Sequence, residues 1–137
     1  MVDATQGDAP YHVDIIAAGH TLVADEPPSN GGQGVGPSPF DLVLAGLAAC
    51  TEITLRMYAE RKGWTGFNVT TQLRHRMEGK VRLIDRKVEV RGAPDAAGIE
   101  RLRDIVERTP VTLALKPGFT ISTVLDQAAA HQPGAAP

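Results

Sequence analysis

The chain has 137 residues, of which 42% are hydrophobic and 22% are charged, and its formal net charge is −2. This length and composition are typical of one globular domain with a core of its own, and they exclude an intrinsically disordered chain. The slight excess of acidic residues has the wrong sign for a dedicated nucleic-acid-binding protein, whose affinity depends on neutralising phosphates.

The cysteine content and the N-terminus indicate where the protein works. A single cysteine, Cys50, excludes an intrachain disulfide and a cysteine-rich zinc site. Residues 1–10 include Asp3 and Asp8 but no basic residue and no apolar run, which is unlike a signal peptide. The longest apolar stretch, residues 42–50, is too short to cross a bilayer. We expect a cytoplasmic protein that associates with no membrane and no nucleic acid.

The first predicted elements are two short strands. Residues 11–17 alternate in side-chain character, and residues 20–24 follow after a Gly-containing dipeptide, a pattern that predicts a β-hairpin. Residues 25–37 contain four glycines and three prolines and are expected to form a loop or mobile flap. The glycines at 31–36 fit neither the phosphate-loop nor the dinucleotide-binding spacing, so a connector is favoured over a phosphate site.

A long helix is predicted next. Ser38 is typical of an N-cap, Pro39 of the first helical position, and Asp41 of the acidic position of a capping box. The helix should run from Pro39 to about Lys62 and end at Gly63. Its first half is apolar on nearly all sides and must be surrounded by protein, which in a chain of this size indicates a second subunit. The 100° spacing places on one face Val43, Gly46, Leu47, Cys50, Ile53, Thr54 and Met57.

After the helix the apolar period changes from about four residues to two. Residues 67–74 predict one strand, residues 77–80 a turn, and residues 81–91 the partner strand. The apolar residues at 83 and 84 are out of phase with those at 88 and 90, so we expect a β-bulge near Asp85.

The C-terminal third is predicted to contain two helices and a closing strand. A second helix begins at Pro94-Asp95 and ends near residue 108, and a short third helix covers residues 111–115 after Thr109-Pro110. A strand should follow over residues 119–125, with a frayed tail over 126–137. We therefore expect one α+β domain over residues 1–137, with its ordered core over about residues 11–125.

Few side chains in the chain could carry chemistry. A lone Cys50 on an apolar helix is usually a small buried hydrophobe, and a reactive thiolate there would need a nearby cation. The four histidines show no metal-ligand spacing, so we expect no metal and no cofactor. Eight basic side chains are interpreted as a solvated hairpin surface: Arg74, His75, Arg76, Lys80, Arg82, Arg86, Lys87 and Arg91.

One block of the sequence resembles the OsmC/Ohr family, in its OsmC-like branch. The block runs from Asp25-Glu26-Pro27 through Gly36-Pro37-Ser38-Pro39 and Ala48-Ala49-Cys50-Thr51 to Lys62-Gly63-Trp64. The order of elements extends the resemblance over about residues 20–125. It implies the OsmC-like α+β fold, with antiparallel sheets around a long central helix in an intertwined homodimer.

The resemblance also implies thiol chemistry. Cys50 matches the peroxidatic cysteine, which attacks a hydroperoxide and becomes a sulfenic acid. The family's second cysteine, in a Cys-Pro-Val segment, is replaced here by Thr109, so an external thiol reductant is needed. His20 lies near the position of an arginine that the partner subunit supplies, and Asp41 lies one residue after the family's glutamate, whose register Phe40 occupies.

Two functions remain open from the sequence. The first is a stress-response enzyme that reduces organic hydroperoxides through one cysteine. The second is a binding or accessory protein that keeps the dimer and a pocket for a small apolar ligand but has lost peroxide turnover. Asp41 is also explained as a helix cap, and His20 as an ordinary strand histidine.

Overall fold

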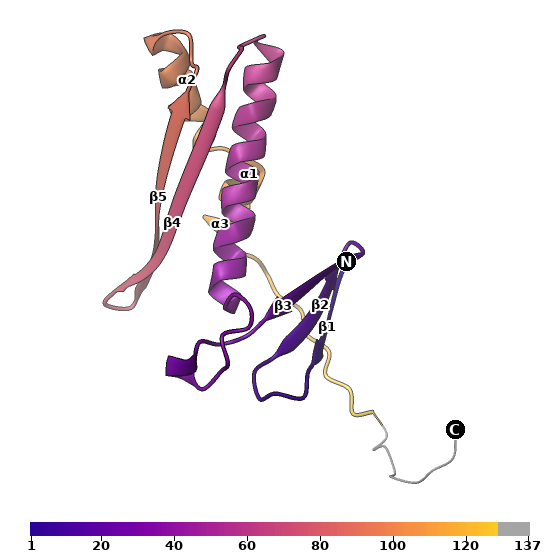
Figure 1. Ribbon diagram of the computed structural model, residues 1–137. Helices are drawn as coiled ribbons and strands as arrows, with labels where there is room; N and C mark the ends of the chain where they lie inside the picture. The colour runs from indigo at the N-terminus through magenta and orange to yellow at the C-terminus, as the bar shows by residue number, and fades with distance from the viewer. Residues whose placement is uncertain (129–137) are drawn as a thin grey trace.

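The computed structural model describes residues 1–128 and confirms the predicted α+β class (Figure 1). A three-stranded antiparallel sheet lies at one end of the molecule, and a two-stranded antiparallel hairpin runs along a long central helix. Most of the predicted tail over 126–137 lies outside the described residues, and residues 126–128 have no regular structure.

The N-terminal sheet contains strands β1 (Val2–Gln6), β2 (Val13–Ala17) and β3 (His20–Ala24), in that order. The predicted β2–β3 hairpin is present, and Ala18 and Gly19 connect it with φ values of 50° and 84°, as a type I′ turn requires. Strand β1 was not predicted. All five of its residues are exposed, so the strand has no buried face, and its ladder with β2 holds it in place.

The predicted loop after β3 is built around a buried carboxylate. Asp25 is only 3% exposed, and its side chain accepts backbone N–H bonds from Glu26 at 2.7 Å, Gln33 at 3.1 Å and Val35 at 3.2 Å. A single 3₁₀ turn, η1 (Pro28–Asn30), lies inside the loop. One side chain therefore gathers backbone groups from both ends of this glycine-rich segment.

The central helix α1 (Pro39–Arg61) begins and ends as predicted. Asp41 N–H donates to Ser38 Oγ at 3.3 Å, and Ser38 N–H donates to the Asp41 carboxylate at 3.0 Å, which completes the capping box. Lys62 is the C-cap, and Gly63 follows with φ 70°.

One side of α1 is buried against the rest of the described chain. The residues fully covered by the rest of the chain recur every four positions: Leu47, Thr51, Leu55 and Ala59. Val43, Ile53 and Met57, which the helical spacing places on one face with Leu47 and Cys50, are between 41% and 55% exposed. Because the first half of α1 is apolar all round, its periodicity could not select which side packs on the chain's own strands.

Helix α1 is long enough and apolar enough to cross a membrane by length and composition alone. The uninterrupted apolar stretch, residues 42–50, is too short to cross a bilayer, but the whole helix is longer than this stretch. In the fold, α1 packs along β4 and also contacts α2 and α3, so it is the core helix.

Strands β4 (Asn68–Glu78) and β5 (Val81–Arg91) pair over their full length, from Asn68↔Arg91 to Glu78↔Val81. The ladder is unbroken, so the predicted bulge near Asp85 is wrong. Ile84 has the same parity as Val88 and Val90 and needs no bulge to share their face, whereas Leu83 points to the opposite face.

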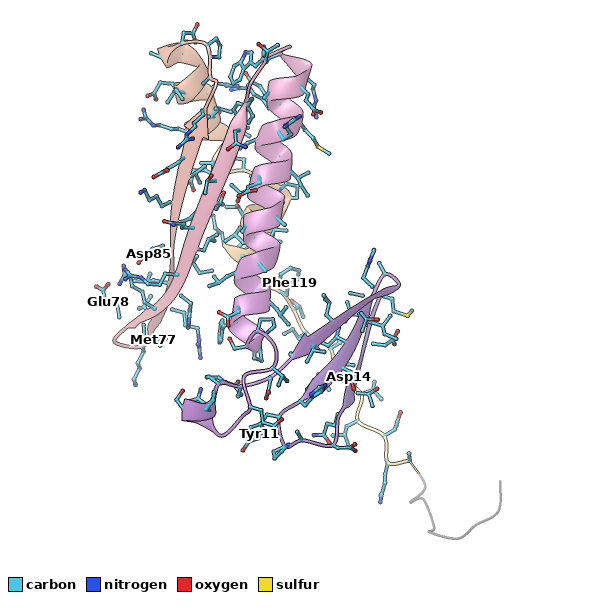
Figure 2. The ribbon with its side chains drawn as sticks, in the orientation of Figure 1. Tyr11, Asp14, Met77, Glu78, Asp85 and Phe119 are labelled. Carbon is cyan, nitrogen blue, oxygen red and sulfur yellow. The ribbon has the colours of Figure 1, made fainter. Side chains whose placement is uncertain are left out.

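The outer face of this hairpin is charged. Asp85 accepts hydrogen bonds from Arg74 at 3.0 Å and from Arg76 at 2.7 Å, toward the turn end where Met77 and Glu78 also lie (Figure 2). These ion pairs are exposed and agree with the solvated surface expected for most of the basic hairpin residues.

Helices α2 (Ala96–Val106) and α3 (Pro110–Leu115) occur where they were predicted, with Asp95 and Thr109 as their N-caps. Helix α2 closes a core at the C-terminal half of α1, whose fully buried members are Leu55, Ala59, Phe67 and Leu102. This core joins α1, the hairpin and α2 into one unit.

The predicted closing strand over 119–125 is absent. Residues 119–128 have no regular structure, and Phe119 is 69% exposed and Leu125 90% exposed (Figure 2). A strand requires a neighbouring strand for its backbone groups, and residues 119–128 pair with none in the described part of the chain.

Candidate active site around Cys50

The thiol of Cys50 lies at the middle of α1, where α3 approaches the helix. The side chain is half-buried, and its Sγ accepts the backbone N–H of Val111 at 3.4 Å. The Thr54 hydroxyl, one turn further along α1, lies 4.0 Å from the same sulfur. The sulfur therefore has one backbone donor from a different element of the fold.

The start of α3 explains why that donor is free. Thr109 is the N-cap and Pro110 the first helical residue, so the N–H of Val111 has no acceptor within its own helix. The Thr109-Pro110 pair begins α3 a few residues after the end of α2, and the Val111 N–H, which has no acceptor within α3, donates to the Cys50 sulfur.

Arg86 links the helices around the sulfur. Its Nη1 donates to the Thr51 hydroxyl at 3.1 Å and to the Thr112 hydroxyl at 2.9 Å, and its Nη2 donates to the Val106 carbonyl at 2.9 Å. The side chain is 12% exposed. The interpretation of Arg86 as a solvated hairpin residue is wrong, because its parity with Val88 places it on the inner face of β5.

Two grooves lie near this cluster. One, of about 620 Å³, is lined by Leu47, Arg86 and Thr112 among others, and another, of about 430 Å³, follows the exposed side of α1 past Ile53 and Met57. Cys50 lines neither groove. Among residues 1–128 no three His, Cys, Asp or Glu side chains come together as a metal-binding group.

A family model described as OsmC-like protein matches residues 31–124, which includes α1, the hairpin, α2 and α3. This chain belongs to the OsmC-like family. The resemblance seen in residues 25–64 is thereby confirmed. No curated protein sequence matches the chain.

Solved structures share the OsmC-like fold at low sequence identity. An osmotic-stress-induced and detoxification-response protein from Psychrobacter arcticus is 19% identical, with a TM-score of 0.71 over 85% of this chain and 88% of that one. The organic hydroperoxide resistance protein OsmC from Legionella pneumophila is 22% identical, with a TM-score of 0.61 over 85% and 88% of the two chains.

A third structure, an organic hydroperoxide resistance protein from Vibrio cholerae, holds captopril in one of its active sites. It is 18% identical to this chain, with a TM-score of 0.60 over 85% of this chain and 84% of that one. At these identities the three structures show the shared fold, with antiparallel sheets and a long central helix.

The OsmC-like chain brings only part of the predicted site together. Thr109 lies in the segment that contacts Cys50, but its hydroxyl is fully buried and lies 2.6 Å from the Thr112 hydroxyl. His20 is exposed on β3, in the separate N-terminal sheet, opposite Ala17. A single chain therefore places Thr109 beside the sulfur's donor and leaves His20 in another part of the fold.

Asp41 lies nine residues before Cys50, about 13 Å along the helix axis. The Ser38 hydroxyl, and then the Ser38 N–H, hold the pKa of this carboxyl below its usual value, so it is an ionised helix cap. Phe40, which the resemblance was expected to place at the register of the family's glutamate, stacks on His75 with ring centroids 4.2 Å apart. Phe40 therefore brings an aromatic ring, and no carboxylate, to the start of α1.

Proposed function

We propose that this OsmC-like protein is a cytoplasmic homodimer that reduces organic hydroperoxides through Cys50 and is regenerated by an external thiol. The observation that carries the proposal is the Val111 N–H directed at Sγ from 3.4 Å, in the middle of the central helix. A donor at the sulfur stabilises negative charge there, and the thiolate is the form of cysteine that attacks.

The reaction balances with one cysteine. The Cys50 thiolate attacks one peroxide oxygen, the S–O bond forms as the O–O bond breaks, and the alkoxide leaves and takes a proton to become the alcohol. The sulfur loses two electrons and is left as a sulfenic acid. An external thiol then attacks that sulfur with loss of water, and a second thiol releases Cys50 and leaves as the disulfide of the reductant.

Two exposed apolar surfaces support the dimer. Val43, Ile53 and Met57 leave one side of α1 uncovered by the chain itself. The apolar side chains of the N-terminal sheet are mostly exposed or half-buried, and within residues 1–128 the sheet makes at most marginal contact with other helices and strands. A second copy that packs on α1 would cover this side of the helix and would bring another N-terminal sheet toward Cys50.

The first experiment measures consumption of cumene hydroperoxide with dithiothreitol, for the wild-type protein and for Cys50→Ser. We expect turnover in the wild type and none above background in the variant. Dimedone should trap one sulfenic acid per chain, on Cys50 only. A folded wild-type protein that neither forms this adduct nor consumes hydroperoxide would contradict the proposal.

A second experiment restores the missing thiol. Thr109→Cys places a thiol in the segment that reaches the sulfur, so hydroperoxide should convert the variant to an intrachain disulfide between Cys50 and the introduced thiol, detected by a mass decrease of about two daltons. Thr109→Ser is the matched control and should give only the sulfenic acid. No disulfide in folded Thr109→Cys would show that residue 109 does not approach Cys50 during the reaction.

A binding or accessory role is the second candidate, favoured by the buried pairing of Thr109 with Thr112. The Thr109 hydroxyl is bonded within the fold, and Thr109 supplies no second thiol that could reduce an oxidised Cys50. In this case small apolar ligands would raise the melting temperature of the wild type and of Cys50→Ser equally, while hydroperoxide consumption would stay at background.

A further inference from the structure

Arg86 is more deeply buried than the other hairpin arginines that form hydrogen bonds within residues 1–128, Arg74 and Arg76. Burying a guanidinium costs free energy, which a close carboxylate usually offsets. Here the close acceptors are neutral: two threonine hydroxyls and the Val106 carbonyl. Such acceptors are typical of a side chain that holds secondary-structure elements together by hydrogen bonds, rather than of an ion pair.

The charged groups facing Arg86 are few. From the end of α2, Glu107 lies 3.8 Å from Nη2, is 59% exposed, and is bonded to Lys116 at 2.9 Å. The hydrogen bond from Lys116 holds the pKa of Glu107 below its usual range. The contacts of Arg86 with α1 and α3 are to hydroxyl groups. Glu107 is therefore satisfied mainly by Lys116, and Arg86 is directed to the helices.

The contacts of Arg86 flank the sulfur's hydrogen bond. Thr51 is the residue after Cys50, and Thr112 is the residue after Val111. One nitrogen, Nη1, therefore bonds the neighbour of the acceptor sulfur and the neighbour of its N–H donor. The Thr112 hydroxyl also meets that of Thr109 at 2.6 Å, which extends the connection to the N-cap of α3.

We propose that Arg86 is a positioning residue for Cys50, which holds α3 against α1 so that the Val111 N–H stays directed at Sγ. Its relevance to catalysis rests on the proposed function, but its effect on the thiol does not. The N···S distance is already 3.4 Å, so a displacement of α3 by about 1 Å would remove the hydrogen bond.

The test measures how fast iodoacetamide alkylates Cys50 as a function of pH, in folded protein. For Arg86→Met we expect the pH of half-maximal alkylation to rise by about one unit, because a hydrogen bond to a charged group changes an equilibrium roughly tenfold. Arg86→Lys keeps the charge but loses the planar fork that reaches several acceptors, so it should recover only part of this shift.

Lys87→Met is the matched control. Lys87 is the next residue on β5, but its side chain is 68% exposed and pairs with Glu89 on the outer face. Its removal deletes the same charge from the same strand without touching the helices. The half-maximal pH should equal that of the wild type, and a shift as large as that of Arg86→Met would overturn the positioning role in favour of a general charge effect.

Thr112→Val covers the case in which Arg86→Met does not fold. This variant keeps Arg86 and removes only the hydroxyl through which it holds α3. We expect the half-maximal pH to rise in the same direction, and the double variant with Arg86→Met, where it folds, to show no further rise. An unchanged half-maximal pH in folded Thr112→Val overturns the proposal.

Alkylation requires no hydroperoxide, so the two proposals fail separately. Wild-type protein without hydroperoxide turnover, but with the expected shifts in alkylation, would refute the proposed enzyme and support the positioning role. Normal turnover with identical alkylation profiles in all folded variants would do the opposite.

Discussion

The helix–hairpin half and the N-terminal sheet of this chain are held together in different ways. The first half has a core in which Leu55 and Ala59 are no more than 1% exposed. The second has three strands whose only fully buried apolar residue is Ala24. Figure 1 shows the sheet standing apart from the hairpin, and the loop after β3 joins the sheet to α1.

A single chain therefore stabilises its two regions unequally. Three strands become independently stable when one apolar face is covered, and here the cover is absent within the described part of the chain itself. The helix–hairpin half should therefore account for most of the stability of an isolated chain, and the N-terminal sheet should depend on the proposed second copy.

The largest effect is expected from Leu55→Ala. Leu55 is 1% exposed and lies in the core between α1, the hairpin and α2, so its truncation should lower the free energy of unfolding by about 2–5 kcal/mol. Urea denaturation followed by circular dichroism measures this. Leu113→Ala, a matched change at a 53% exposed position on α3, should cost roughly 0.5 kcal/mol or less.

Ile53→Glu tests the dependence on a second copy. A carboxylate on the exposed apolar side of α1 would be buried in the proposed dimer, so we expect association to weaken by roughly a hundredfold or more. Sedimentation velocity measures the association. Amide hydrogen exchange should then be fast in β1–β3 and still slow in β4–β5. Equal protection in both regions would contradict the dependence of the N-terminal sheet on a second copy. Lys62→Glu, at the end of the helix, is the control.

The helix cap at the junction of the two halves should have a smaller effect. Ser38→Ala removes the hydroxyl that caps α1 and should lower the free energy of unfolding by about 1 kcal/mol at pH 7.

The acidic residue of the same cap gives a pH-dependent effect. Because the folded-state pKa of Asp41 is depressed, its ionised form contributes stability above its ordinary value of 3.8. The deficit of Asp41→Asn relative to wild type should therefore be full at neutral pH and shrink as the pH falls below that value. Thermal melts from about pH 3 to about pH 7 would measure it.

The smallest effect on global stability is expected at Asp25. Burial favours a raised pKa for this carboxyl, but backbone N–H bonds from Val35, Glu26 and Gln33 outweigh it and leave the pKa below the usual 3.8. The hydrogen bonds from the loop backbone to the ionised Asp25 carboxylate should therefore persist above that pH. They should be lost as the pH falls through the depressed pKa. The amide resonances of Gln33 and Val35 should titrate there, and in Asp25→Asn they should not; resonances that never move would contradict this role.

Local signals in the sequence were sufficient for most elements. The Ser38-Pro39-Phe40-Asp41 cap, the Ala18-Gly19 turn and the Thr109-Pro110 start each combine residues that favour one backbone geometry. They predicted α1, the β2–β3 hairpin and α3 because these geometries depend on residues within four positions of one another.

What the sequence could not predict depended on distant residues. Strand β1 buries none of its residues and is held by pairing with β2. Residues 119–125 have the composition of a strand but no neighbour in the described chain. Arg86 was grouped with exposed arginines, although its parity with Val88 and Val90 is visible in the sequence and could have placed it inward.

The hairpin and the helix beside it are also matched in size. Eleven residues per strand extend about 36 Å. The 23 residues of α1 extend about 35 Å. Deleting one residue from β4 would turn Val69 and Leu73 toward water. Deleting two from each strand would shorten the hairpin by about 7 Å and strip more than one helical turn of its cover. Insertions and deletions in natural or engineered variants should therefore be confined to the connecting segments, above all residues 25–37 and the turn at Gly79.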